Sequence, residues 1–112
     1  MRTEKEMFHI IINTARSDDR VLAAYLKGSR ANPNVPRDIY QDFDIMYVVT
    51  ETESFRADLS WMDPFGKVIL KLEQDDVFGY GDRFGLRSHY DRTYSWLLIF
   101  GDGNRIDIGV ET

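Results

Sequence analysis

Two aspartates separated by one residue are the part of this sequence best suited to chemistry. Asp42 and Asp44 stand at the start of an apolar run over residues 45–49. Side chains of a strand alternate between its faces, so both carboxylates would lie on one face while Phe43 and Ile45 point into the core. Carboxylate oxygens are the ligands that hard cations such as Mg²⁺ prefer. A divalent metal site is therefore the first hypothesis.

A third aspartate interrupts a later apolar strand. Asp107 lies between Ile106 and Ile108. Two carboxylates about 4 Å apart repel by about 4 kcal/mol at an effective dielectric constant near 20. Three such pairs would approach the whole stability of a domain, about 5–15 kcal/mol. A cluster of the three acids would persist only with protonated members or bound cations, whereas an isolated Asp-x-Asp motif is often two solvent-facing acids.

A glycine-serine corner precedes the aspartates. Gly28 and Ser29 follow an apolar run over residues 21–26, and residues 30–41, which contain two prolines, lead back to Asp42. Backbone amides just after Gly28 could point outward and bind an anion, as they do at helix N-termini and in anion-binding nests. The stretch therefore combines groups suited to a divalent metal with groups suited to a polyphosphate.

The elements that must position these residues form an α/β (α+β) pattern. Apolar and β-branched runs predict a mixed sheet of about five strands. These runs cover residues 21–26 (expected to be buried on both faces), 45–49, 67–72, 94–100 and 105–110. Residues 101–104 predict a tight hairpin turn between the last two strands. The polar segment 73–92 predicts a long loop.

Two helices are expected to flank the sheet. Thr3 and Glu6 form a capping-box pattern that predicts a helix start. An apolar stripe then follows at helical spacing, made of Phe8, Ile11, Ile12 and Ala15. The second helix is predicted over residues 55–62, with Ser54 as its N-cap and Asp63-Pro64 as its stop.

Composition and charge limit the function classes. A chain of 112 residues, 43% hydrophobic and 29% charged, is typical of one globular domain. The net charge of −5 argues against a general nucleic-acid binder and suits a cationic co-substrate. The absence of cysteine excludes disulfides and thiolate metal sites. No signal core and no apolar run of membrane-spanning length occur, so we expect a cytoplasmic protein with no membrane partner.

The combination of motifs resembles the nucleotidyltransferase superfamily with the DNA polymerase β-like fold. More closely, it is similar to the aminoglycoside 6-adenylyltransferase (streptomycin adenylyltransferase) family. The similar segments are Leu26-Lys-Gly28-Ser29-Arg30-Ala-Asn32, Gln41-Asp42-Phe43-Asp44, residues 61–66, and Asp102-Gly-Asn-Arg-Ile-Asp107. The resemblance covers nearly the whole chain and is weakest over residues 73–92.

The resemblance implies transfer of AMP from ATP to a hydroxyl of an aminoglycoside such as streptomycin, with release of pyrophosphate. It implies that Gly28 and Ser29 bind the ATP phosphates, and Arg30 is a further phosphate-binding candidate. It also implies that Asp42, Asp44 and Asp107 hold two Mg²⁺ ions. A two-metal site stabilises both the attacking and the leaving oxygen of an in-line displacement.

The family's pattern includes a further helical domain after the nucleotidyltransferase domain. We therefore expect residues 1–112 to form the nucleotidyltransferase domain alone, without the helical domain that completes the substrate pocket. Two alternatives remain open. One is AMP transfer to a protein acceptor. The other is a catalytically silent nucleotide- and metal-binding module that self-associates, as a homo-oligomer, through the surface that the absent domain would cover.

Overall fold

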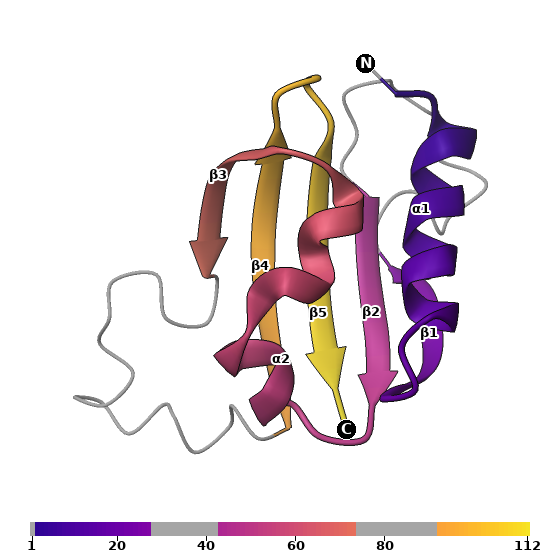
Figure 1. The fold of residues 1–112 in the computed structure, drawn as a ribbon, viewed down its shortest axis with the longest axis vertical. Helices are drawn as coiled ribbons and strands as arrows, with labels where there is room; N and C mark the ends of the chain where they lie inside the picture. Colours follow the sequence, from indigo (N-terminus) through magenta and orange to yellow (C-terminus); the bar gives the residue numbers. More distant parts are fainter. Residues whose placement is uncertain (1, 28–42, 74–91) are drawn as a thin grey trace.

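A computed structural model describes residues 2–27, 43–73 and 92–112 of the chain. In these residues five strands form one sheet in the order β1-β2-β5-β4-β3 (Figure 1). The strands are β1 Val21–Lys27, β2 Phe43–Val49, β3 Val68–Glu73, β4 Thr93–Phe100 and β5 Arg105–Glu111. Strands β2 and β5 are parallel, whereas the other neighbouring pairs are antiparallel. The predicted mixed sheet of five strands is confirmed.

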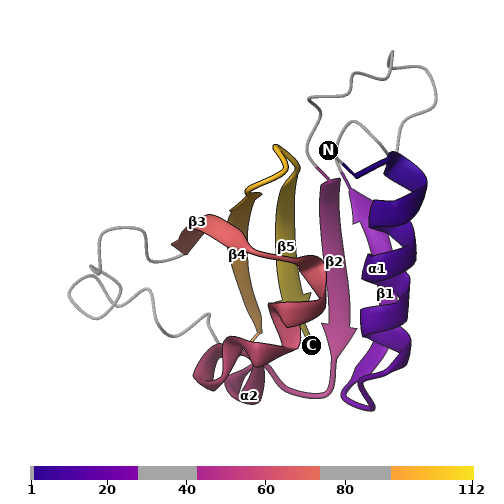
Figure 2. The ribbon, with the colours of Figure 1, turned by 45° about the horizontal axis from the view of Figure 1, so that its top comes forward.

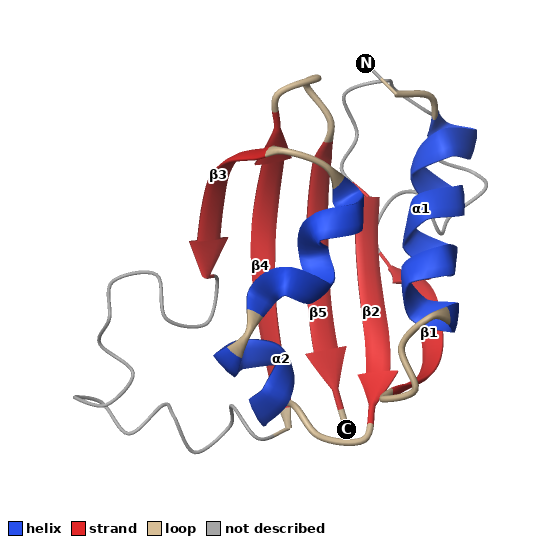
Figure 3. Ribbon diagram, viewed as in Figure 1, coloured by secondary structure: helices blue, strands red, loops and turns tan. Residues whose placement is uncertain are grey.

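All described helices cover one face of this sheet (Figures 2 and 3). They are the α-helices α1 Glu4–Arg16 and α2 Glu53–Ala57, and the 3₁₀-helix η2 Leu59–Phe65. The core lies between these helices and the sheet. Its largest fully buried side chains include Met7, Phe43, Tyr47, Phe55, Phe65, Trp96 and Phe100. No helix in the described part of the chain covers the opposite face, which we call the open face.

Helix α1 begins at the predicted capping box. The Thr3 hydroxyl accepts the Glu6 amide at 3.1 Å, and the Glu6 carboxylate accepts the Thr3 amide at 3.2 Å. In the expected apolar stripe Ile11 is buried, but Ile12 is 45% exposed, and Met7 is fully buried instead.

Within the described segments no helix is long and apolar enough to cross a membrane.

The single helix predicted over residues 55–62 is wrong. The chain forms α2 and then η2, because Asp58 between them has extended backbone angles and its carboxylate accepts the Ser60 amide at 3.0 Å. Thr52, rather than Ser54, occupies the N-cap position of α2. Pro64 lies inside η2 instead of ending the helix before it, and Gly66 follows as the C-cap with a φ of 112°.

Strand β1 is not buried on both faces as its sequence suggested. It lies at one edge of the sheet, where Leu22 is 67% exposed and Tyr25 is 45% exposed. An edge strand has a neighbour on one side only, so an apolar run there is covered less than the same run at the centre. Strand β3 forms the other edge, and its Ile69 is 61% exposed.

The hairpin at the end of the chain agrees with the prediction. Strands β4 and β5 pair antiparallel across the turn at residues 101–104, in which Gly103 has a φ of 91°. A positive φ favours glycine, because a Cβ would be strained there. Side chains of β4 alternate as expected, with Trp96 and Leu98 fully buried on the helix-covered face.

Candidate metal and nucleotide site

Two of the three candidate metal ligands lie side by side on two inner strands of the sheet, near the end at which both strands begin. Asp44 of β2 and Asp107 of β5 are register partners in the parallel pair. Neighbouring strands are about 4.8 Å apart, so two side chains at the same register position are in reach of a shared cation. Although 63 residues separate the two positions in sequence, strand order brings them together.

Both carboxylates belong to the open face. The residues flanking them, Phe43 and Ile45 on β2 and Ile106 and Ile108 on β5, are at most 2% exposed and belong to the core under the helices. Since side chains alternate along a strand, Asp44 and Asp107 face the other way, and both are half-buried. The alternation expected for residues 43–45 is confirmed.

One carboxylate oxygen of Asp107, Oδ1, is a buried hydrogen-bond acceptor without a donor among the described residues. A buried acceptor without a donor costs about 1–3 kcal/mol, and more when it is charged. A carboxylate pair about 5 Å apart adds a repulsion of about 3 kcal/mol at an effective dielectric constant near 20. A hard divalent cation would relieve both costs, so the donor set fits Mg²⁺.

The remaining predicted site residues lie outside the described segments. These residues are Gly28, Ser29, Arg30 and Asp42. Within the described segments no group of three histidine, cysteine, aspartate or glutamate side chains is placed to hold a metal. The structure therefore brings Asp44 and Asp107 together and leaves the contribution of Asp42 as a prediction.

Lys27 is a candidate that the sequence analysis missed. It is the last residue of β1 and the register partner of Asp44, so the two side chains lie on the same face. Lys27 also stands immediately before Gly28 in the sequence. A cation at the start of the glycine-serine corner, next to the acid pair, is suited to bind phosphate. The signal that could have found it is a basic residue at the end of an apolar strand directly before Gly-Ser.

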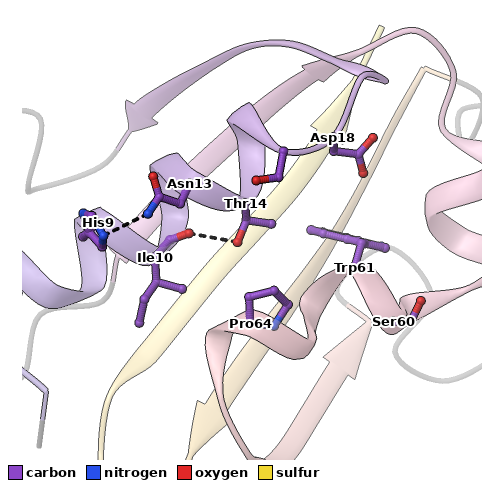
Figure 4. A pocket seen from close by; sticks show the side chains of 9 residues that line it. His9, Ile10, Asn13, Thr14, Asp18, Ser60, Trp61 and Pro64 are labelled. Atoms are coloured by element: carbon purple, nitrogen blue, oxygen red, sulfur yellow. Dashed lines mark hydrogen bonds between the residues drawn. The ribbon is translucent and has the colours of Figure 1, made fainter.

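One described groove is on the helix-covered face, away from Asp44 and Asp107. It has a volume of about 400 Å³ and lies between α1 and η2 (Figure 4). Several of its polar groups have partners: the His9 ring bonds to the Asn13 amide at 2.9 Å, and the Thr14 hydroxyl donates to the Ile10 carbonyl at 2.8 Å. Asp18, at its rim, forms an ion pair with Arg20. These contacts are within α1 or in the turn that follows it, and they identify no reactive pair of groups in the groove.

Comparison with known proteins shows which family this chain resembles in sequence and in fold. The family model described as streptomycin adenylyltransferase matches residues 1–112. Aminoglycoside 6-adenylyltransferases from Bacillus subtilis and Campylobacter jejuni are each 37% identical to the chain over 108 residues, which is 96% of this chain. A crystal structure of an aminoglycoside 6-adenyltransferase from Bacillus subtilis matches 99% of the chain with a TM-score of 0.72 and 27% identity.

The match covers only part of each relative. The chain spans 36% of the Bacillus subtilis protein, 35% of the Campylobacter jejuni protein and 35% of the crystallised chain. The family model, in contrast, matches the chain over its whole length, and the fold of the chain is similar to that of a crystallised aminoglycoside 6-adenyltransferase. The chain therefore belongs to the streptomycin adenylyltransferase family.

Proposed function

We propose that this chain forms the metal- and nucleotide-binding part of an adenylyltransferase that modifies an aminoglycoside. The observation that carries the proposal is the pairing of Asp44 with Asp107 on the open face, in a chain of this family. The relatives' names supply the acceptor class. The net charge of −5 is compatible with a cationic acceptor.

The proposed reaction is an in-line displacement at the α-phosphorus of ATP. An acceptor hydroxyl oxygen forms a bond to that phosphorus while the bond to the bridging oxygen of the β-phosphate breaks. Pyrophosphate leaves, and the hydroxyl proton passes to a base or to solvent. The products are the adenylylated acceptor and pyrophosphate. Streptomycin is the proposed acceptor because the family model carries its name.

The site residues have distinct proposed roles. Asp44 and Asp107, together with Asp42, would hold two Mg²⁺ ions, which supply charge stabilisation for the attacking and leaving oxygens. Gly28 and Ser29 would bind the triphosphate through the corner that follows β1. Lys27 and Arg30 would neutralise phosphate charge. The half-buried positions of Asp44 and Asp107 strengthen their electrostatic interactions relative to water.

Equilibrium binding of ATP tests this proposal. We expect the chain to bind ATP only when Mg²⁺ is present, because the aspartates alone would repel the triphosphate. Asp44→Asn and Asp107→Asn should each weaken the binding by about tenfold or more, measured by isothermal titration calorimetry. Asp63→Asn is the matched control, since Asp63 is an exposed acid on η2 and its loss changes the net charge equally. Equal ATP affinity in the wild type and both site variants would contradict the proposal.

The acceptor is tested separately. ATP labelled at the α-phosphate is offered with streptomycin or with a cell lysate, and label in the aminoglycoside supports the proposal. Label in a protein instead would favour AMP transfer to a protein acceptor. We propose that the acceptor pocket of the family is completed by the roughly two thirds of each relative that this chain does not match. The assay therefore includes a full-length relative as the positive control.

A self-associating binding module is the second candidate. Large apolar side chains are exposed on both edge strands of the sheet: Leu22 and Tyr25 on β1, and Ile69 and Leu70 on β3. Apolar surface of this kind promotes association. An oligomer, detected by light scattering, that binds ATP but labels no acceptor would favour this second candidate.

A further inference from the structure

The turn between β4 and β5 is held by a side chain from the start of the chain. Arg2 Nε donates to Asp102 Oδ2 at 2.7 Å, and the Arg2 backbone amide donates to the same oxygen at 3.2 Å. The guanidinium also donates to the carbonyl of Phe65 and lies 5.1 Å from the centre of the Phe100 ring. Arg2 therefore connects the N-terminal segment, the end of η2 and the hairpin.

The Asp102 side chain also accepts two hydrogen bonds from Asn104 within the same turn. Its Oδ1 accepts the backbone amide of Asn104 at 3.1 Å, and its Oδ2 accepts the Asn104 side-chain amide at 3.0 Å. Asn104 is only 6% exposed and also donates from Nδ2 to the Arg2 carbonyl at 3.2 Å. The three side chains Arg2, Asp102 and Asn104 form one connected set of hydrogen bonds, which we call the turn clamp.

The turn clamp lies directly before the strand that carries Asp107. Strand β5 begins at Arg105, one residue after Asn104. In a hairpin, the turn sets the register of the strand that follows, and a slip by one residue moves every side chain to the opposite face. Such a slip would turn Asp107 into the core. A slip by two residues would move it about 7 Å away from Asp44 along the sheet.

We propose that Asp102 is a positioning residue for the metal site. Through the turn clamp it fixes the register of β5 that places Asp107 opposite Asp44. This inference rests on the proposed function, since it assumes that the two aspartates bind a metal–nucleotide complex. It assigns a role to the first residue of the Asp102-Gly-Asn-Arg-Ile-Asp107 segment, which acts through the turn.

The chain contains a matched control for Asp102. Asp18 also accepts the backbone amide two residues later, that of Arg20, at 3.0 Å, and also forms an ion pair with an arginine side chain. Asp18 precedes β1 at the other end of the sheet, where Val21 pairs with Val49. Because Val49 is five residues beyond Asp44, the two ends are roughly 17 Å apart along the strands. Loss of Asp18 therefore removes equivalent contacts far from the acid pair.

The experiment compares Asp102→Ala with Asp18→Ala in Mg²⁺-dependent ATP binding by isothermal titration calorimetry. Both variants should lower the melting temperature, since each loses an ion pair and a turn hydrogen bond. Asp102→Ala should also weaken ATP binding by about tenfold, the range found for residues that orient metal ligands, whereas Asp18→Ala should change it by less than about twofold. Asp102→Asn keeps an oxygen that can accept the Asn104 amide, so it should recover part of the affinity.

The outcomes separate the two proposals. The positioning role would be overturned if Asp102→Asn and a folded Asp102→Ala both bind ATP with wild-type affinity. If Asp44→Asn loses ATP binding in the same experiment, the proposed function stays in place. Equal losses in Asp102→Ala and Asp18→Ala would also overturn the positioning role, because the effect would then be general destabilisation. Absence of Mg²⁺-dependent ATP binding in the wild type would overturn both. If Asp102→Ala does not fold, Asp102→Asn decides, and it should lose at least about threefold in affinity.

Discussion

At the scale of single residues, four of the described aspartates fall into two kinds. Asp18 and Asp102 each accept hydrogen bonds from an arginine side chain and from a backbone amide. Asp44 and Asp107 face each other across two parallel strands. The first kind stabilises turns, whereas the second kind accumulates negative charge at one place. The sequence alone singled out the second kind, because Asp107 interrupts an apolar strand and Asp44 stands, with Asp42, at the start of another.

The turn aspartates should make the fold sensitive to acid. Hydrogen bonds from Arg2 lower the pKa of Asp102, and hydrogen bonds from Arg20 lower the pKa of Asp18. A carboxyl group whose pKa is lowered by folding stabilises the fold above its unfolded pKa, and this contribution is lost as the pH falls through the folded pKa. We therefore expect the wild type to lose stability below about pH 4.

Urea denaturation across a pH series checks this expectation. The free energy of unfolding of Asp102→Asn should be lower than that of the wild type by a constant amount at neutral pH. The difference should shrink below about pH 4, since the wild-type carboxylate is then progressively protonated. Asp63→Asn, at an exposed position, should track the wild type throughout. A difference that stays constant down to the lowest pH at which the wild type is folded would contradict this reasoning.

At the scale of elements, the sequence predicted the positions of the strands better than the burial of β1 or the break between α2 and η2. Alternation in β4 and the glycine-rich turn before β5 are local signals, and the structure agrees with both. The burial of β1 depends on which strands become neighbours, and an apolar run carries no information about that. The break between α2 and η2 depends on the Asp58 side chain accepting the Ser60 amide, which helical spacing does not reveal.

Helix α1 is fixed to the sheet by one buried hydrogen bond in addition to its apolar face. The Tyr47 hydroxyl donates to the Ile11 carbonyl at 2.6 Å, and Tyr47 is fully buried. Tyr47→Phe should lower the free energy of unfolding by about 0.5–1.5 kcal/mol, measured by urea denaturation. Tyr25→Phe is the control, because that hydroxyl bonds to Glu111 at 2.7 Å on the exposed side of the edge strand. Equal effects of the two substitutions would show that burial does not determine the contribution.

At the scale of the whole molecule, strand order creates the candidate site. Strand β5 inserts between β2 and β4, so the segment that begins at Arg105 lies beside the one that begins at Phe43. Neither composition nor periodicity specifies this crossover, although the resemblance to a family of known fold implied it. Spacing in the sequence could therefore name Asp44 and Asp107 as candidates. That the two residues are neighbours is seen only in the strand order of the sheet. Asp42, Gly28, Ser29 and Arg30 remain predictions, because they lie outside the described residues.

The most direct test of the account is the melting temperature of Asp107→Asn, with and without Mg²⁺ and ATP. Without divalent cations, the substitution removes a repulsion of about 3 kcal/mol between two carboxylates. Each kilocalorie per mole shifts the melting temperature of a domain of this size by about 4–8 °C. We predict that the variant melts roughly 12–24 °C above the wild type in chelator, and that Mg²⁺ with ATP raises the melting temperature of the wild type more than that of the variant. A variant that melts below the wild type in chelator and is stabilised by Mg²⁺ with ATP as much as the wild type would contradict this prediction.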